Sequence, residues 1–204
     1  MRIVTQLIPL VLIAVPPAIA GAEQPVEAGA PLFHLNFDES FAANARGEAQ
    51  PSRGSSRPDR VEGIDGHAAR FAPGQTLSYQ TKGNLHKPEG TLSFWIKLPA
   101  PEGKASRAPV VLFSEQAPEE PGNSRLHVEL YPGRFIRLNL NDSRNSIVDY
   151  HGLGDWKPDE WHHVAITWNS KKGGLFYVDG VPAGISWVRA WEPVAHDTFV
   201  IGSA

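Results

Sequence analysis

The stretch "RLHVELYPGRFIRLNLN", from Arg125 to Asn141, decides the fold class of this 204-residue chain. Apolar and polar residues alternate at period two on either side of residues 132–134, which is typical of half-buried β-strands joined by a turn. Similar short runs recur along the chain between clusters of Gly, Pro, Asn, Asp and Ser, whereas long helical periodicity is missing. The sequence therefore predicts an all-β protein.

The register of this hairpin follows from its pattern. A three-residue loop at 132–134 keeps apolar residues opposite apolar ones, whereas a two-residue loop would set Val128 opposite Arg137 and mix the faces. The predicted cross-strand pairs are Leu130–Ile136, Val128–Leu138 and Leu126–Leu140 on one face, with Glu129–Arg137 and His127–Asn139 on the other. An opposite-charge pair of this kind contributes ~0.2–1 kcal/mol.

Three further segments predict strands. "TLSFWIKLP" (residues 91–99) places Phe94 and Ile96 on one face, and "HHVAITW" (162–168) alternates in the same way. "GLFYVDGVPAGISW" (174–187) predicts two strands joined at Asp179-Gly180, because Gly tolerates the positive φ of tight hairpin turns. The stretches predicted to be mobile surface loops are Ala43–Arg60, Pro99–Pro109 and Glu115–Ser124, because they are rich in Pro, Gly and Ser.

The N-terminal residues predict export. Residues 1–20 combine Arg2, a short apolar run and small residues at 18 and 20, which indicates a secretory signal peptide. The apolar run is too short to span a bilayer, so no transmembrane anchor is expected. We therefore expect a tether at 21–31 and one domain at 32–204, in a protein that is secreted or held in the periplasm or cell envelope.

Composition excludes several kinds of chemistry. The chain has no cysteine, so disulfides, thiolate nucleophiles and Cys-ligated metals are absent. The formal net charge is −3, and Lys and Arg are scattered rather than gathered in a basic stripe. Nucleic acid is therefore not an expected partner.

The adjacent histidines His162 and His163 invite a catalytic or metal-binding interpretation, with Glu160 close by. Neighbouring side chains of a strand point to opposite faces, so the two rings cannot chelate one ion. A zincin-type site needs histidines four residues apart on a helix, together with a third ligand. We therefore expect both histidines to be structural, one near the entrance of the strand and one capped by a backbone partner.

Taken in order, six stretches resemble a known family, the laminin-G-like or concanavalin A-like jelly-roll domains of bacterial exported proteins. They are "LFHLNFDES" (32–40), "GIDGHAARF" (63–71), "GTLSFWIKLP" (90–99), "EWHHVAITW" (160–168), "GLFYVDGVPAG" (174–184) and "FVIGSA" (199–204). The resemblance implies a two-sheet antiparallel jelly-roll sandwich with ligands on its concave face or rim. Family members usually continue past the last stretch with a strand that pairs near the N-terminal strand. We therefore expect this chain to lack its last strand, to leave an unpaired edge at Leu32–Phe37, and to belong to a longer protein or to receive the strand from another chain.

The resemblance also suggests chemistry to test against the residues. Glycoside hydrolases with this fold take their paired carboxylates from one strand with an E-x-D-x-x-E-like spacing, which this chain lacks, so no catalytic residue is assigned. Calcium is the usual ion of related domains, and Asp38, Asn141 and Asp142 carry suitable oxygens. Their spacing does not form an ordered ligand loop, so no metal site is assigned and the cofactor stays unknown.

The polar face of the first hairpin carries the candidate ligand-binding residues. It is either a solvated outer face with one ion pair, or a sugar-binding face where hydrogen-bond donors lie beside an aromatic ring. The candidates are His127, Glu129, Arg137, Asn139, Trp187 and Trp191. Trp95, Trp161 and Trp168 are assigned to packing, and Trp156 is counted with Trp187 and Trp191 as exposed.

The favoured function is a non-catalytic module of an exported protein that binds glycan or a cell-surface polymer. One alternative is an accessory domain of a carbohydrate-active enzyme whose catalytic part lies beyond residue 204. Another is a structural or adhesion spacer without a ligand. Fold alone does not choose among these.

Overall fold

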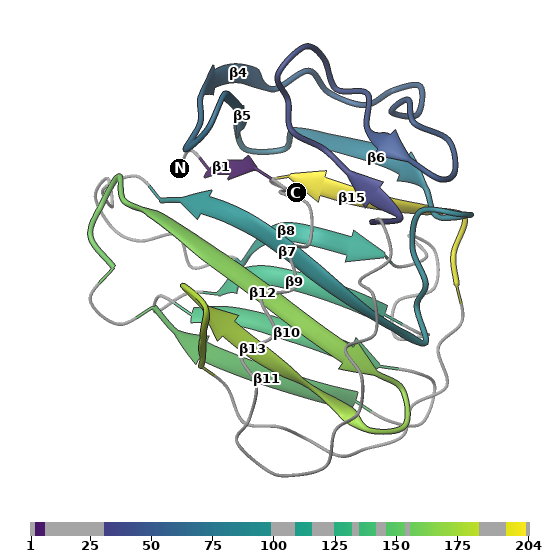
Figure 1. The fold of residues 1–204 in the computed structure, drawn as a ribbon, viewed down its shortest axis with the longest axis vertical. Coiled ribbons are helices and arrows are strands. Elements are labelled where there is room, and N and C mark those ends of the chain that lie inside the picture. The colour runs from purple at the N-terminus through teal and green to yellow at the C-terminus, as the bar shows by residue number, and fades with distance from the viewer. Residues whose placement is uncertain are drawn as a thin grey trace, which may run out of the picture.

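The computed structural model describes residues 3–6, 31–98, 109–115, 125–131, 135–141, 146–153, 156–183 and 195–202. Its regular elements are all strands, and every strand pair is antiparallel. Figure 1 shows two large sheets, one behind the other. None of the described residues forms a helix long and apolar enough to cross a membrane.

The front sheet in Figure 1 has seven strands. In spatial order these are β14 (Val181–Pro182), β13 (Gly173–Val178), β12 (Trp161–Asn169), β7 (Glu89–Lys97), β1 (Ile3–Gln6), β5 (His67–Phe71) and β4 (Asp59–Glu62). The sheet behind it has six strands, in the order β11 (Ser146–Gly152), β10 (Phe135–Asn141), β9 (Arg125–Tyr131), β8 (Val110–Glu115), β15 (Thr198–Gly202) and β6 (Thr76–Gln80). A small third sheet pairs β2 (Phe33–His34) with β3 (Asn44–Ala45).

The hydrophobic core lies between the two large sheets, and each sheet contributes alternate residues to it. The six-stranded sheet contributes Leu126, Val128, Ile136, Leu138 and Leu140, and the seven-stranded sheet contributes Phe94, Ile96, Val164, Ile166, Trp168 and Phe176. These side chains are all buried, and burial of a large apolar side chain stabilises a fold by about 1.5–3 kcal/mol. The period-two alternation in the sequence therefore corresponds to side chains that point alternately into the core and to the outer face.

The predicted strand registers are confirmed. In the β9–β10 hairpin Leu130 faces Ile136, Glu129 faces Arg137 and His127 faces Asn139. The β13–β14 turn has positive φ at both Asp179 (50°) and Gly180 (79°), which is the backbone of a two-residue type I′ hairpin. The antiparallel two-sheet sandwich is thus the fold of this chain.

Two loop predictions were wrong in part. Part of the Ala43–Arg60 stretch runs alongside β6. Ser52 N–H donates to the carbonyl of Ser78 (2.7 Å), and Ser56 N–H donates to the carbonyl of Thr76 (2.8 Å). These bonds cover the edge strand of the six-stranded sheet, so the two serines supply backbone pairing here. Glu115 was placed at the start of a loop, yet it ends β8 with no exposed surface.

The expected open edge at Leu32–Phe37 is not found. Phe33 and His34 pair with β3, and Leu35 and Phe37 are fully buried. The stretch therefore packs onto the core without joining either large sheet. Most of the other two predicted loops, Pro99–Pro109 and Glu115–Ser124, lies outside the described residues.

Candidate functional site

The polar residues predicted on the hairpin lie together on what we call the β9–β10 outer face, the side of these two strands turned away from the core. It comprises His127, Glu129, Tyr131, Phe135, Arg137 and Asn139. Side chains two residues apart share a face of a strand, and Glu129 and Arg137 form one of its cross-strand pairs. The neighbouring strand β8 adds Ser114, which lies directly opposite His127.

A hydrogen-bonded row runs across this face from β8 to β10. The hydroxyl of Ser114 lies 2.9 Å from Nδ1 of His127, and Nε2 of His127 lies 3.2 Å from Oε2 of Glu129. The other carboxylate oxygen of Glu129 forms an ion pair with Arg137. An ionised carboxylate only accepts hydrogen bonds, so Nε2 of His127 donates to Glu129, while the serine hydroxyl can either donate to Nδ1 or accept from it.

The solvated-face interpretation fails for the middle of this row. His127 and Glu129 are buried, and the Arg137 side chain is 19% exposed. Buried charges must be paired and hydrogen-bonded, because each loses its hydration. Both conditions are met around Glu129, so this row holds the Arg137 guanidinium in one position.

Two aromatic residues of this face were not among the sequence candidates. Tyr131 and Phe135 form the cross-strand pair next to Glu129–Arg137, and the Arg137 guanidinium lies 4.3 Å from the centre of the Tyr131 ring. Phe135 is 39% exposed, one of the few large apolar residues that are open to solvent in the described chain. The alternation in the sequence already places both rings on the same face as Glu129 and Arg137, so the pattern could have identified them as members of this face.

The remaining sequence candidates are placed as follows. Trp187, Trp191 and Asp142 lie outside the described residues. Asn139 lies half-buried opposite His127. Trp156 was counted as exposed, but it packs against the core and stacks on the His162 ring with centroids 4.0 Å apart.

The oxygen-bearing residues considered for calcium have structural roles in the described part. Asp38 accepts hydrogen bonds from the backbone of His67 (2.9 Å) and the side chain of Asn36 (2.7 Å). Asn141 pairs with Ser146 and Arg125 at the end of β10. Among the described residues no three His, Asp or Glu side chains are grouped to hold a metal ion.

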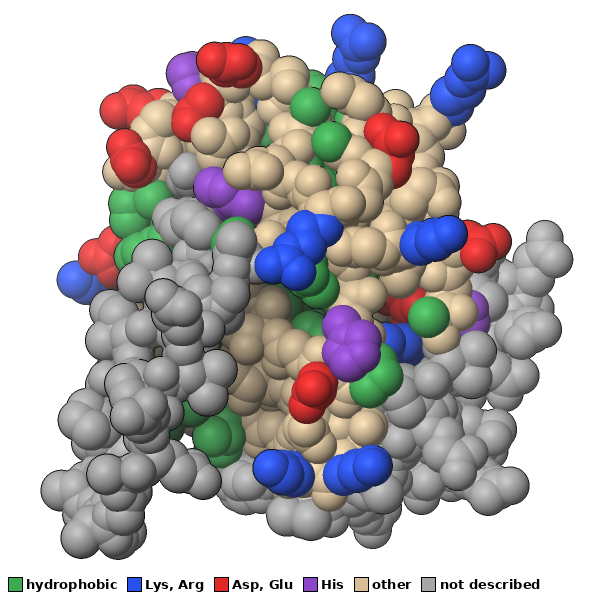
Figure 2. Space-filling model, turned by 45° about the vertical axis from the view of Figure 1, so that its right-hand side comes forward, with side chains coloured by type: hydrophobic (Ala, Val, Ile, Leu, Met, Phe, Trp, Pro, Cys, Tyr) green, Lys and Arg blue, Asp and Glu red, His purple; other side chains and the backbone are tan. Residues whose placement is uncertain are grey.

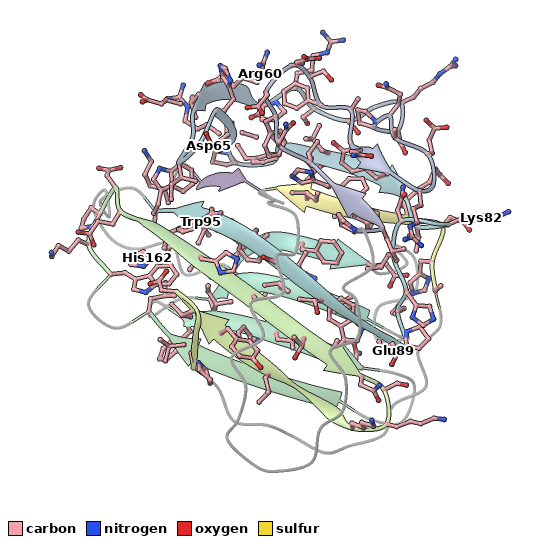
Figure 3. All side chains as sticks on the ribbon, viewed as in Figure 1. Arg60, Asp65, Lys82, Glu89, Trp95 and His162 are labelled. Carbon is pink, nitrogen blue, oxygen red and sulfur yellow. The ribbon has the colours of Figure 1, made fainter. Side chains whose placement is uncertain are left out.

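The two histidines of β12 take part in separate contacts. His162 Nδ1 lies 2.9 Å from Oδ2 of Asp179, whereas His163 Nε2 lies 2.7 Å from the hydroxyl of Ser93. Figure 3 labels Trp95 on β7 and His162 near the same end of β12, and the Trp95 ring lies beside His163 at 5.2 Å. The rings do not converge on one site, although their partners are side chains rather than the backbone partner expected for one of them.

Asp179 joins the hairpin turn to the start of β12. Its Oδ1 accepts the backbone N–H of His163 (2.8 Å), and its own N–H donates to the His163 carbonyl (2.9 Å). Burial lowers the pKa of His163 from its usual 6.5, and the negative charge of Asp179 opposes that shift. These hydrogen bonds hold the β13–β14 turn against the start of β12.

A second buried ion pair lies inside the fold. The Lys87 ammonium forms an ion pair with Glu115, and neither side chain has more than 1% of its surface exposed. Glu115 also accepts the backbone N–H of His196 (2.6 Å), and the Lys87 carbonyl accepts from the Trp168 indole (2.8 Å). Burial lowers the pKa of Lys87, while the hydrogen bond and charge of Glu115 oppose this. The pair ties the loop before β7 to β8.

Charged side chains of both signs lie on one face of the described chain. In the face seen in Figure 2, acidic, basic and histidine side chains are interspersed rather than gathered by sign.

The family model for the concanavalin A-like lectin/glucanases superfamily, of laminin G type, matches residues 73–204. This range is more than half of the chain, and the chain belongs to this family. No curated protein sequence matches the chain.

Several solved structures share the fold. The botulinum neurotoxin serotype D ligand-binding domain in complex with N-acetylneuraminic acid has a TM-score of 0.61 and 16% identity, over 84% of this chain and 42% of that one. Domain 4 of AbnA, a GH43 extracellular arabinanase from Geobacillus stearothermophilus, in complex with arabinotriose, has a TM-score of 0.56 and 18% identity, over 84% and 82%. The binding domain of botulinum neurotoxin DC in complex with rat synaptotagmin II has a TM-score of 0.56 and 12% identity, over 84% and 43%.

These similarities show the fold of the chain. This chain spans less than half of either toxin chain and most of the arabinanase domain. The three structures are described in complex with arabinotriose, N-acetylneuraminic acid and rat synaptotagmin II, which are ligands of different chemical kinds.

Proposed function

We propose that this chain is a non-catalytic carbohydrate-binding module of an exported protein, and that the β9–β10 outer face holds the glycan. Phe135 and Tyr131 would stack on the apolar face of a sugar ring, and Arg137 and Asn139 would bond its hydroxyl groups. His127 and Glu129 would not touch the ligand but would keep Arg137 in place. In this proposal the Trp187 and Trp191 residues remain candidates for the rim.

One observation carries the proposal, which is the combination of an exposed ring with a fixed donor. Phe135 is exposed, and Arg137 is held between the Tyr131 ring and the Glu129 carboxylate. Binding sites gain affinity when their groups are ordered before the ligand arrives, because less conformational entropy is lost. A long arginine side chain on an open surface would lack this advantage.

The relatives guide the choice of probes. The arabinanase domain is described with arabinotriose and the toxin domain with N-acetylneuraminic acid, so both sugars belong in the first screen. Sugars bound by such modules stack on aromatic rings and use a few convergent polar groups. The β9–β10 outer face offers both kinds of group.

The experiment is a glycan-array screen of the purified protein, with and without calcium, followed by affinity measurement for the tightest glycan. Phe135→Ala should weaken binding at least tenfold, and Asn139→Ala should weaken it to a smaller degree. The matched control is Val181→Ala on β14, an exposed apolar residue of the other sheet with 63% of its surface open. Its affinity should equal that of the unmodified protein.

Other outcomes would favour the other functions. Absence of binding to every glycan under both conditions would favour a spacer or a protein ligand. Cleavage of the bound glycan would indicate an enzyme. Binding that Phe135→Ala leaves unchanged would place the ligand on another surface.

A further inference from the structure

Strand β1, the shortest interior strand of the seven-stranded sheet, lies between β7 and β5 and not at an edge. Ile3, Val4 and Thr5 pair with Phe71, Arg70 and Ala69 of β5, while Val4, Thr5 and Gln6 pair with Lys97, Ile96 and Trp95 of β7. Figure 1 shows β1 as a short arrow between these longer strands. Four residues thus separate the β4–β5 hairpin from the rest of the sheet.

The interval that β1 fills cannot close by itself. Because β5 and β7 each run antiparallel to β1, they run parallel to each other, about two strand spacings or roughly 9.5 Å apart. Without an occupant their facing N–H and carbonyl groups would lose their partners, and unpaired backbone groups are costly when buried. The fully buried Ala69, Phe71 and Ile96 line this part of the sheet.

The interval also extends along β7 beyond the register of Ile3–Gln6. On the side of β7 away from β12, the described residues include no strand that pairs with Glu89–Phe94. A strand continuing two residues beyond the position of Gln6 would reach Phe94 and Ser93 on β7, but on β5 it would reach only His67, the first residue of that strand, before the turn at Gly66. A longer segment would therefore extend the ladder chiefly along β7.

The strand register shows which kind of side chain fits at each position of such an occupant. The position of Thr5 lies between Ala69 and Ile96, two core residues, so an apolar side chain fits there. The position of Val4 lies on the outer face between Lys97 and Arg70, and Arg70 already forms an ion pair with Asp59 at 2.7 Å, so an acidic side chain there would lie between two cations, one of them shared with Asp59. Opposite-charge cross-strand pairs stabilise sheets, and like charges destabilise them.

We propose that the interval between β5 and β7 is a strand-binding site, in which an extended segment of another polypeptide chain exchanges with Ile3–Gln6. That segment has apolar residues at alternate positions and an acidic residue between them. Main-chain hydrogen bonds to both walls supply affinity, and the alternate side chains supply specificity. Ile3–Gln6 also lie within the predicted signal peptide, so removal of residues 1–20 would leave the interval open for this partner.

The test uses the full-length chain and labelled peptides. The probe is a fluorescein-labelled peptide with the sequence of residues 2–8, RIVTQLI, in two forms that carry Val4→Glu or Val4→Lys. Proline cannot lie in the interior of a sheet, so Thr5→Pro in the protein should release β1. The Val4→Glu peptide should bind this variant at least tenfold more tightly than the unmodified protein, and at least tenfold more tightly than the Val4→Lys peptide does. Equal affinities in either comparison would overturn the proposal.

A second measurement uses the unmodified protein, so it does not depend on how the variant folds. Excess Val4→Glu peptide should speed hydrogen exchange at the amides of residues 3–6, because β1 is displaced. The amides of residues 69–71 and 95–97 should stay protected, because the peptide replaces β1. A peptide carrying Thr5→Pro is the control and should change nothing. Unchanged exchange at residues 3–6 with saturating Val4→Glu peptide would contradict the proposal.

Discussion

The Glu129 carboxylate meets the Arg137 guanidinium across β9 and β10, with only 5% of the Glu129 side chain exposed. The same carboxylate accepts a hydrogen bond from His127. From the sequence alone, this ion pair could have been a solvated surface contact. In the structure it is buried and supports the candidate site. Breaking this ion pair should therefore cost more stability than breaking an exposed one, because the remaining buried charge is left without a partner.

Glu129→Ala should lower the free energy of unfolding by about 3–5 kcal/mol, because Arg137 would lose its buried counter-charge. Urea unfolding followed by tryptophan fluorescence measures this. The control is Glu160→Ala, which removes an exposed ion pair with Lys157 and should cost less than about 1 kcal/mol. Similar losses in the two variants would mean that Glu129 is more solvated than its burial indicates.

Lys87→Met should also destabilise the protein by about 3–5 kcal/mol, since Glu115 would be left buried and unpaired. Adding Glu115→Leu to this variant should recover most of the loss, because two apolar side chains can replace a buried pair. Urea unfolding of both variants gives the comparison. A double variant less stable than Lys87→Met alone would show that Glu115 matters chiefly through its bond to His196 N–H.

Gly90→Ala should destabilise the protein by about 1–3 kcal/mol, because overpacking forces a buried neighbour to move. A Cβ at Gly90 would lie 2.7 Å from the buried Trp168 ring. Gly152→Ala is the matched control, since its Cβ would meet Phe135 at an ordinary 3.6 Å. Thermal unfolding should rank the variants in this order, and a Gly90→Ala protein as stable as the control would contradict the packing around Trp168.

The pH dependence of stability should include a contribution from His163. Its folded pKa lies below the unfolded 6.5, mainly because of burial, so the unfolded state takes up the proton first as pH falls. The contribution is complete above the unfolded pKa and is lost as pH falls through the folded pKa. His163→Gln should therefore lose less stability than the unmodified protein between about pH 7.5 and about pH 5. Equal losses would show that the His163 ring is protonated as readily in the folded state.

The sequence predicted the fold because strand alternation is a local property. Leu126, Val128, Ile136 and Leu138 alternate with polar residues, and that pattern alone determined the register and the core face of the hairpin. It also separated His162 from His163, because neighbouring side chains of a strand face opposite ways.

Burial of the outer face was not predictable from the same pattern. Alternation says which residues share a face, but it does not say whether that face is covered, and His127 and Glu129 are buried. Pairing of the serine-rich stretch along β6 was missed for a related reason. Ser52 and Ser56 bond through their backbones, which composition does not reveal.

The most direct test of the proposed function locates the glycan on the protein. Amide chemical shifts should be recorded while the tightest glycan from the array is titrated into the isotope-labelled protein. The largest changes are expected at Tyr131, Phe135, Arg137 and Asn139, with little change along β12 and β13. Changes confined to β12 and β13, or none at saturating glycan, would contradict a carbohydrate site on the β9–β10 outer face.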